Sequence, residues 1–227
     1  MKTALVTGAS SGIGAAIARA LLKEGYTVVG CARRVDAIPD GVHAYRVDLR
    51  QEADILAMWE DVRARFGGVD VLVNNAGVGF AEPLVSGDTE RWRQMLEVNV
   101  LALCVCTREA LADMGDGPGH IVHISSMAGH RVPPGSGVYS ATKFAVRSLT
   151  EGLRKELRAK GSPVRVCSVS PGLVQTEFHG NYYGSDVTHD LRVLDSQDVA
   201  NAVLYVLAQP PHVQVHDVLM RPTDQVT

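Results

Sequence analysis

Short apolar runs alternate with longer segments of helical periodicity along the whole chain. Runs rich in Val, Ile, Thr and Ala predict β-strands at residues 4–6, 27–29, 69–73, 120–124, 164–169 and 213–219. Between most of these strands, apolar positions recur with helical spacing, which predicts helices at residues 13–24, 54–66, 89–114, 139–160 and 198–207. The strands are continuously apolar rather than alternating, which is typical of a parallel sheet covered by helices on both faces.

Right-handed crossovers between such strands predict a single α/β domain over residues 1–227, with a doubly wound parallel sheet of the Rossmann type. One connection is unusual. After the second strand, only about ten residues lead to the next β-branched stretch at 42–47, whereas a parallel crossover usually needs a dozen or more. Residues 39–41, Pro-Asp-Gly, are typical of a turn. We therefore expect this crossover helix to be shortened to a turn or lost.

Composition narrows the class of protein. The chain of 227 residues has a net charge of −3 and no basic tract, so nucleic acid is not an expected partner. Its longest apolar run, residues 100–106, is far shorter than the roughly 20 residues of a membrane helix. The amino-terminal residues enter the first strand directly and leave no room for a signal segment. We expect a cytoplasmic protein that is not bound to a membrane.

The cysteine and histidine spacing predicts no metal site and no disulfide framework. The four cysteines fall in apolar strand or helix segments, which is typical of small buried side chains in a reducing compartment. His120 and His123 are three residues apart on a predicted strand and so face opposite sides of it.

A glycine-rich loop follows the first predicted strand and opens the first helix. Its glycines, Gly8, Gly12 and Gly14, would let the backbone turn tightly and approach a pyrophosphate at the helix N-terminus. The spacing Gly-x3-Gly-x-Gly differs from the generic Gly-x-Gly-x2-Gly fingerprint, and such a loop alone is often only a turn. Its place between strand and helix favours a dinucleotide site.

The end of the second strand carries two arginines where a carboxylate would bind the ribose of NAD. Arg33 and Arg34 suit a 2′-phosphate instead, because a guanidinium can grip a phosphate with paired hydrogen bonds. The alternative is an ordinary solvated basic pair. With the glycine loop upstream, the sequence favours NADP(H) over NAD(H).

Four further residues form a candidate catalytic set. Tyr139 and Lys143 stand one helical turn apart, and a neighbouring ammonium would lower the pKa of the phenol toward neutrality. Ser126 follows the strand at 120–124, where a hydroxyl could reach a substrate carbonyl. Asn99 lies inside a predicted helix, where asparagine is a poor helix former, so its presence needs a reason.

Together these motifs resemble the short-chain dehydrogenase/reductase family over essentially the whole chain. The matching segments are residues 7–14, 74–77, 99, 126, 139–143 and 171–172. The resemblance implies that Tyr139 is the general acid/base, that Lys143 lowers its pKa and holds the nicotinamide ribose, and that Ser126 orients the carbonyl. It also implies that Asn99 holds a water linking Lys143 to solvent.

Within the family, residues 28–33, 99–110, 129–132, 139–157 and 221–227 look most like those of NADP-dependent carbonyl and hydroxysteroid reductases. The cofactor contacts implied by the resemblance are Gly8, Ser10, Ser11, Gly12, Ile13, Gly14, Arg33, Arg34, Asp48, Leu49, Asn75, Ala76, Gly77, Tyr139, Lys143, Pro171, Gly172, Val174 and Thr176. Among them, residues 8–14 match the pyrophosphate loop, 48–49 the adenine contact, and 75–77 the adenosine-side wall. Residues 171–176 match the segment that packs on the nicotinamide. The chain departs from the family in its short second crossover and a shortened stretch at 177–195.

The expected function is reversible hydride transfer between NADP(H) and a ketone or secondary alcohol, with a hydrophobic carbonyl compound or ketosteroid as substrate. A non-catalytic NADP-binding sensor would keep the glycine loop but would not need the candidate catalytic set. An epimerase or dehydratase acting on a nucleotide sugar would need a substrate domain, for which 227 residues leave no room.

The substrate pocket is expected at the carboxyl edge of the sheet, lined by apolar side chains. The candidates are Met127, Val132, Val138, Leu173, Phe178 and Tyr182. Arg131 could instead pair with a substrate carboxylate, although an arginine beside two prolines is more often solvated. The covering loop, with Gly180, Gly184 and two tyrosines, is expected to be short and mobile, which would leave the site open.

The stretch at residues 95–111 is apolar nearly all round, so a helix there must be buried on two sides. One side can lie on the sheet. We expect the other side to contact a second copy of the chain, and the family resemblance favours a homotetramer.

Overall fold

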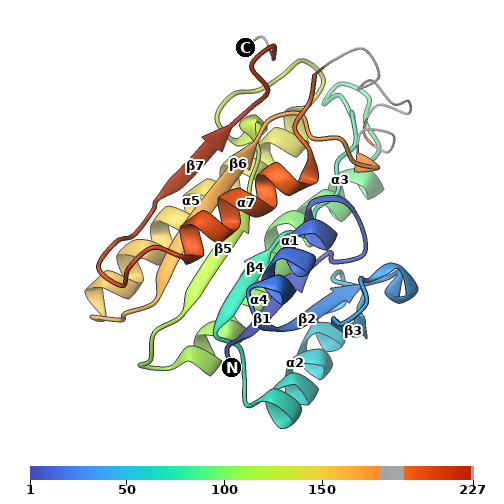
Figure 1. The fold of residues 1–227 in the computed structure, drawn as a ribbon. Helices are drawn as coiled ribbons and strands as arrows, with labels where there is room; N and C mark the ends of the chain where they lie inside the picture. The colour runs from blue at the N-terminus through green and yellow to red at the C-terminus, as the bar shows by residue number, and fades with distance from the viewer. Residues whose placement is uncertain (179–181, 183–191, 226–227) are drawn as a thin grey trace.

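A computed structural model describes residues 1–178, 182 and 192–225 of the chain, which form one α/β domain (Figure 1). Its parallel sheet has the strand order β3-β2-β1-β4-β5-β6-β7. The strands are β1 Thr3–Thr7, β2 Thr27–Ala32, β3 His43–Arg46, β4 Val71–Asn74, β5 His120–Ile124, β6 Arg165–Pro171 and β7 Asp217–Met220. The helices are α1 Gly12–Lys23, η1 Val35–Ala37, α2 Glu52–Phe66, α3 Thr89–Leu96, η2 Glu97–Leu101, α4 Ala102–Met114, η3 Met127–Gly129, α5 Gly137–Ala159 and α7 Ser196–Leu207.

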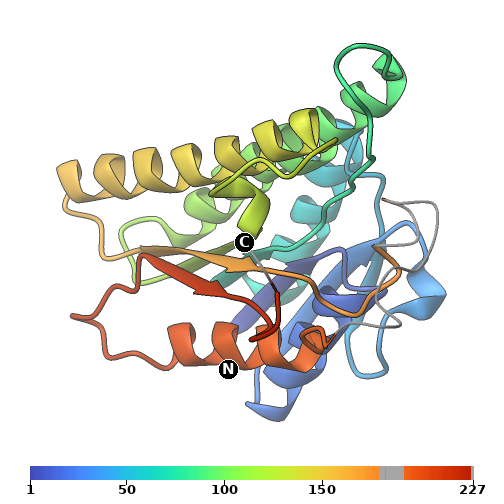
Figure 2. The same ribbon diagram turned by 90° about the horizontal axis from the view of Figure 1, so that it is seen from above.

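Helices cover both faces of the sheet, as the continuously apolar strands predict (Figure 2). On one face, α1 and α7 pack against alternate side chains of the strands, with Ile17 and Val203 fully buried. On the other face lie α2, α4 and α5, around the fully buried Trp59 of α2. The Trp59 indole donates to the Asp113 carboxylate at 2.9 Å and joins α2 to α4. The doubly wound, Rossmann-type prediction is therefore confirmed.

The crossover between β2 and β3 is the shortened one that the sequence predicts. It contains only the 3₁₀ turn η1. The Val42 N–H then donates to the Pro39 carbonyl at 3.2 Å, and Gly41 adopts a φ of +85°, where glycine is favoured. The crossover thus ends in the turn expected from Pro39-Asp40-Gly41.

Two predicted elements differ from the structure. The strand expected at 213–219 begins only at Asp217, and the segment before it is bonded by a side chain of β6. The Arg165 guanidinium donates to the carbonyls of Gln209, Pro210 and Val213. The helix expected at 89–114 contains a π-helical turn, η2, between α3 and α4.

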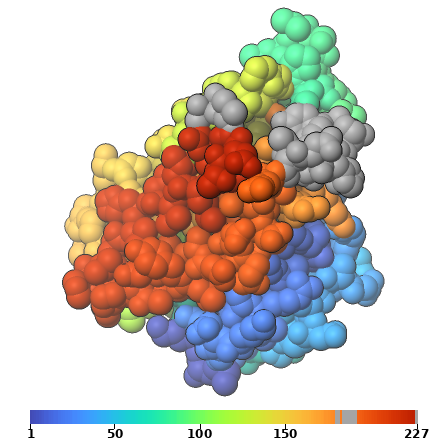
Figure 3. All heavy atoms as spheres, turned by 45° about the horizontal axis from the view of Figure 1, so that its top comes forward, coloured from blue at the N-terminus to red at the C-terminus, as the bar shows by residue number. Residues whose placement is uncertain are grey.

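The connection from β4 to α3 projects from the carboxyl edge of the sheet (Figures 2 and 3). At its tip the side chains of Leu84 and Val85 are exposed, at 71% and 94%. The segment returns to the body of the molecule where Asp88 caps α3 by accepting a hydrogen bond from the Glu90 N–H.

The four cysteines are free thiols. Burial raises the pKa of the Cys31 thiol to about 12, so this thiol stays protonated and packs as a small apolar group. His123 lies inside the core, where its ring nitrogens face the hydroxyls of Thr107 and Thr150. Within the described residues, no group of His, Cys, Asp and Glu could hold a metal, and no helix is long and apolar enough to cross a membrane.

Candidate active site

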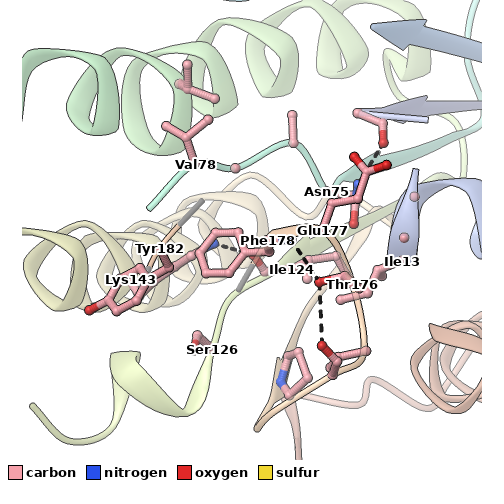
Figure 4. Close-up of a pocket in the computed structure, with 18 of the residues that line it drawn as sticks. Ile13, Asn75, Val78, Ile124, Ser126, Lys143, Thr176, Glu177, Phe178 and Tyr182 are labelled. Atoms are coloured by element: carbon pink, nitrogen blue, oxygen red, sulfur yellow. Dashed lines mark hydrogen bonds between the residues drawn. The ribbon is translucent and has the colours of Figure 1, made fainter. Parts of the chain in front are cut away.

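Segments at the carboxyl ends of strands β1 to β6 line a cavity of about 900 Å³. The cavity lies where the strand order reverses, between β1 and β4, which is where doubly wound sheets bind ligands. In the close-up, Ser126 and Lys143 lie toward one end of the cavity and Ile13 and Asn75 toward the other (Figure 4). The pocket expected at this edge of the sheet is therefore present.

The loop between β1 and α1 depends on its glycines. Gly8 and Gly12 have φ values of +69° and +50°. A Cβ on Gly14 would lie 2.2 Å from the Gly8 carbonyl oxygen, so a side chain there would force the loop open. Ser11 precedes α1 without a side-chain capping bond, which leaves the first N–H groups of the helix available to an anion.

Asn75 holds this loop against the end of β4. Its Nδ2 donates to the Thr7 carbonyl at 2.9 Å, and the Thr7 hydroxyl accepts from the N–H groups of Asn75 and Ala76. Ser10, Ile13, Leu49, Ala76 and Gly77 also line the cavity.

Arg33 and Arg34 both line the cavity, but their side chains make different contacts. Arg34 Nη2 is 2.6 Å from Glu177 Oε2, an exposed ion pair with a residue distant in the sequence. The Arg33 side chain makes no ion pair among the described residues. Asp48 is held by Arg50, whose hydrogen bond lowers the pKa of the Asp48 carboxyl. No local pattern in the sequence indicates Arg50 or Glu177 as a partner of these residues.

Tyr139 and Lys143 occupy one face of α5, as their spacing predicts. Lys143 Nζ lies 5.9 Å from the centre of the Tyr139 ring and donates to the Ile124 carbonyl at 3.0 Å. Both side chains are buried, and burial lowers the pKa of the Lys143 ammonium to about 8. At the end of β5, the Ser126 hydroxyl accepts a hydrogen bond from the Ala128 N–H at 3.1 Å.

The π turn η2 explains the asparagine in the predicted helix. Asn99 Oδ1 accepts from the Val78 N–H, and its Nδ2 donates to the Val78 carbonyl, both at 2.8 Å. The same Nδ2 lies 3.0 Å from the Thr142 hydroxyl on α5. A Cβ on Gly77 would be 3.4 Å from Asn99 Oδ1 and 3.5 Å from Lys143 Nζ, so Asn99 and Lys143 flank the same glycine.

The segment after β6 folds over the glycine loop. A Cβ on Gly12 would lie 2.9 Å from the Thr176 methyl group. Gly172 donates its N–H to the Met220 carbonyl at 2.7 Å. Pro171 and Val174 line the cavity with them.

The C-terminal segment contributes to the cavity as well. Gln225 Oε1 accepts from the Leu173 N–H at 3.0 Å, and both Asp224 and Gln225 line the cavity. A glutamine near a chain end carries no local signal of this role, since only the tertiary fold brings it to Leu173.

Of the substrate-pocket candidates, four line the cavity: Met127, Leu173, Phe178 and Tyr182. Phe178 and Tyr182 pack against the Tyr139 ring, with centroids 5.6 and 5.4 Å away. Two candidates were wrong. Val132 is 62% exposed, and Val138 packs in the aromatic cluster of Tyr139 rather than on the cavity.

Arg131, Gln94, Val98 and Ser136 also line the cavity. Of these four residues, only Arg131 is a candidate from the sequence. The expectation of a mobile loop around Gly180 and Gly184 lies outside the described residues.

Residues 2–185 match the sequence model of the family described as short chain dehydrogenase. The full chain is 49% identical to dehydrogenase/reductase SDR family member 11 of Bos taurus, of which the match covers 98%. It is 43% identical to farnesol dehydrogenase of Aedes aegypti, over 99% of this chain and 97% of that protein. The closed form of serine dehydrogenase complexed with NADP⁺ superposes with a TM-score of 0.93, at 33% identity over 99% of this chain and 96% of the other. The chain belongs to the short-chain dehydrogenase/reductase family, and it is an oxidoreductase.

Proposed function

We propose that this protein, as one domain over residues 1–227, transfers hydride between NADP(H) and a ketone or secondary alcohol. The observation that carries the proposal is the arrangement of a single cavity. Lys143 and Ser126 lie toward one end of it and Ile13 of the glycine loop toward the other, and Tyr139 and Arg33 also line it. Such a cavity can hold a dinucleotide along its length and a small molecule beside the tyrosine.

The residues fit the cofactor. A side chain at position 14 would collide with the Gly8 carbonyl and the Asn75 amide, so the tight loop that would hold a pyrophosphate at the helix N-terminus depends on this glycine. Arg33, whose side chain makes no ion pair among the described residues, is suited to a 2′-phosphate, and the similar serine dehydrogenase structure holds NADP⁺. When bound, the nicotinamide supplies or accepts the hydride.

The chain's own residues would handle the carbonyl oxygen and its proton. The Ser126 hydroxyl accepts from Ala128, so its proton is free to be donated to a substrate carbonyl. Tyr139 would give the proton to that oxygen during reduction and take it back during oxidation. The Lys143 ammonium donates one hydrogen bond to the Ile124 carbonyl, so two N–H groups remain to bond the cofactor ribose and the tyrosine. Asn99 would support the proton path to solvent.

The substrate we propose is a hydrophobic carbonyl compound or ketosteroid. Met127, Leu173, Phe178 and Tyr182 offer apolar or aromatic surface on the substrate side of the cavity. A relative with 43% identity is named for farnesol, a largely hydrocarbon alcohol, which supports this class.

The test is NADPH oxidation by the purified protein with ketosteroids, aryl ketones, diketones and small keto acids. We expect kcat/KM to be highest for the bulky apolar ketones. Tight NADPH binding without turnover of any compound would favour a non-catalytic sensor instead. A clear preference for a small keto acid would contradict the hydrophobic substrate class.

We further propose a cytoplasmic homo-oligomer, with a tetramer favoured by the family. The free cysteines support a reducing compartment. The exposed side chains of Leu96 and Leu101, at 51% and 58%, support burial against a second copy, because both lie in the segment predicted to be covered on two sides.

A further inference from the structure

Arg131 lies in the wall of the cavity and has no role in the site described so far. Its backbone N–H donates to the Met127 carbonyl at 3.2 Å, which fixes it close after Ser126. It lines the cavity together with Met127, Pro133 and Ser136. Arg131 therefore belongs to the substrate side of the cavity rather than to the glycine loop.

The Arg131 guanidinium contains a buried donor without an acceptor. Its Nε is closed to solvent and has no hydrogen-bond partner, and the side chain makes no ion pair with any described residue. A buried N–H left unsatisfied is destabilising, so native proteins rarely keep one. Because Nε is closed to solvent, a ligand oxygen would bind the Nη groups of the same guanidinium, which make no hydrogen bond with any described residue.

The described carboxylates that line the cavity are already paired with other cations. Glu177 pairs with Arg34, and Asp48 with Arg50. Asp224 lies 3.7 Å from Arg192. No described acid of the cavity is left to neutralise Arg131.

We propose that Arg131 is a specificity-determining residue that binds an oxygen acceptor at the end of the substrate remote from the reacting carbonyl. This inference rests on the proposed function of the same cavity. Its substrate is a ketone with an apolar body, which contacts Met127, Leu173 and Phe178, and with a second oxygen function. The two Nη groups present paired donors, which match a carboxylate best and a single carbonyl oxygen less well.

The test uses acetophenones that carry a carboxylate, an acetyl group or a methyl group at the para position, reduced with NADPH. For the wild-type protein we expect a kcat/KM at least tenfold higher for the oxygen-bearing ketones than for the methyl compound. In Arg131→Met this ratio should fall below threefold, through KM rather than kcat. Arg131→Lys should recover part of it for the carboxylate alone, because an ammonium lacks the planar pair of donors.

Arg19→Met is the matched control, since Arg19 is exposed on α1 and remote from the cavity lining. It should keep the wild-type ratio. The melting temperature of Arg131→Met should equal or exceed that of the wild type, because the substitution removes an unsatisfied donor. A structural arginine would instead lower it.

A higher kcat/KM for the carboxylate ketone than for the acetyl ketone would show that Arg131 binds an anionic group of the substrate. Equal kcat/KM values for these two ketones would show that it binds an uncharged oxygen acceptor. Equal kcat/KM for all three ketones, or a ratio retained in Arg131→Met, would overturn the inference.

Calorimetric binding of the carboxylate and methyl ketones to the NADP⁺-loaded wild type and Arg131→Met makes the same comparison without turnover. If no ketone is reduced yet the binding ratio depends on Arg131, the proposed reaction fails and the binding site stands. A binding ratio that ignores Arg131 overturns the site itself.

Discussion

At the residue scale, one amide side chain joins three segments of the site. Asn99 bonds both main-chain groups of Val78 and the hydroxyl of Thr142. It thereby ties the loop after β4 to α5, next to Lys143. An asparagine in an apolar helical stretch is visible in the sequence as an anomaly. Its partners are not, since Val78 and Thr142 reach it only through the tertiary fold.

The proposed acid/base role of the Tyr139 hydroxyl can be tested by removing that single oxygen atom. Tyr139→Phe should reduce turnover with NADPH more than a hundredfold while leaving NADPH affinity nearly unchanged, because only the acid/base hydroxyl is lost. The phenyl ring keeps its contacts with Phe178 and Tyr182. Ketone-dependent NADPH oxidation and fluorescence titration measure the two effects. Tyr205→Phe, at an exposed position of α7, is the control. A variant that retains a tenth of the wild-type rate would show that Tyr139 is not the acid.

The buried Lys143 ammonium predicts a pH-dependent stability. Its pKa is about 8 in the folded protein and about 10.5 when unfolded, so between these values the unfolded chain binds the additional proton. The free energy of unfolding should therefore rise with pH across this window. It should rise by up to a few kcal/mol more for the cofactor-free wild type than for Lys143→Met. Urea denaturation at pH 7.5, 9 and 10 measures the difference. A difference between the two proteins that stays constant with pH would contradict a charged, buried Lys143 at neutral pH.

At the element scale, the sequence predicts what local chemistry controls. The glycine loop after β1 and the turn at Pro39-Asp40-Gly41 follow from their own residues. The π turn η2 does not, because it depends on side-chain bonds to other elements. The late start of β7 likewise involves a distant residue, since Arg165 bonds the Val213 carbonyl at the start of the predicted strand. Periodicity identifies an element, and long-range bonds set where it begins, ends or bends.

Arg33 and Arg34, in the loop after β2, predict a preference for NADPH over NADH. NADPH should bind at least tenfold more tightly than NADH, about 1.4 kcal/mol, and the preference should weaken as salt rises. Arg33→Ala should remove more of it than Arg34→Ala, since Arg34 already pairs with Glu177. Fluorescence titrations at low and high salt, with Arg19→Ala as control, provide the measurement. Equal affinities of the wild type for the two reduced cofactors would exclude a 2′-phosphate site here.

At the scale of the whole molecule, the cavity combines segments that are far apart in the sequence. The strand order brings residues 8–14, 75–78, 125–128 and 171–178 to one edge, and this much follows from the alternation of strands and helices. The closure of the cavity does not follow from it. Gln225 reaches Leu173, and Glu177 reaches Arg34, by contacts that no local pattern encodes. Val132 and Val138 were misassigned for the same reason, since apolar character alone does not say which cavity a side chain lines.

The last prediction concerns assembly. Leu101 ends the π turn with 58% of its surface exposed, and Phe144 on the neighbouring α5 is 39% exposed. If this face is covered by a second copy, a charge placed there must be desolvated, which costs several kcal/mol unless it is paired. Light scattering after size exclusion at micromolar concentration should show a dimer or tetramer for the wild type and smaller species for Leu101→Glu. Leu56→Glu, at a partly exposed position of α2, should leave the mass unchanged. A wild-type protein that elutes only as a monomer would contradict the prediction, because Leu96 and Leu101 would then remain exposed to solvent.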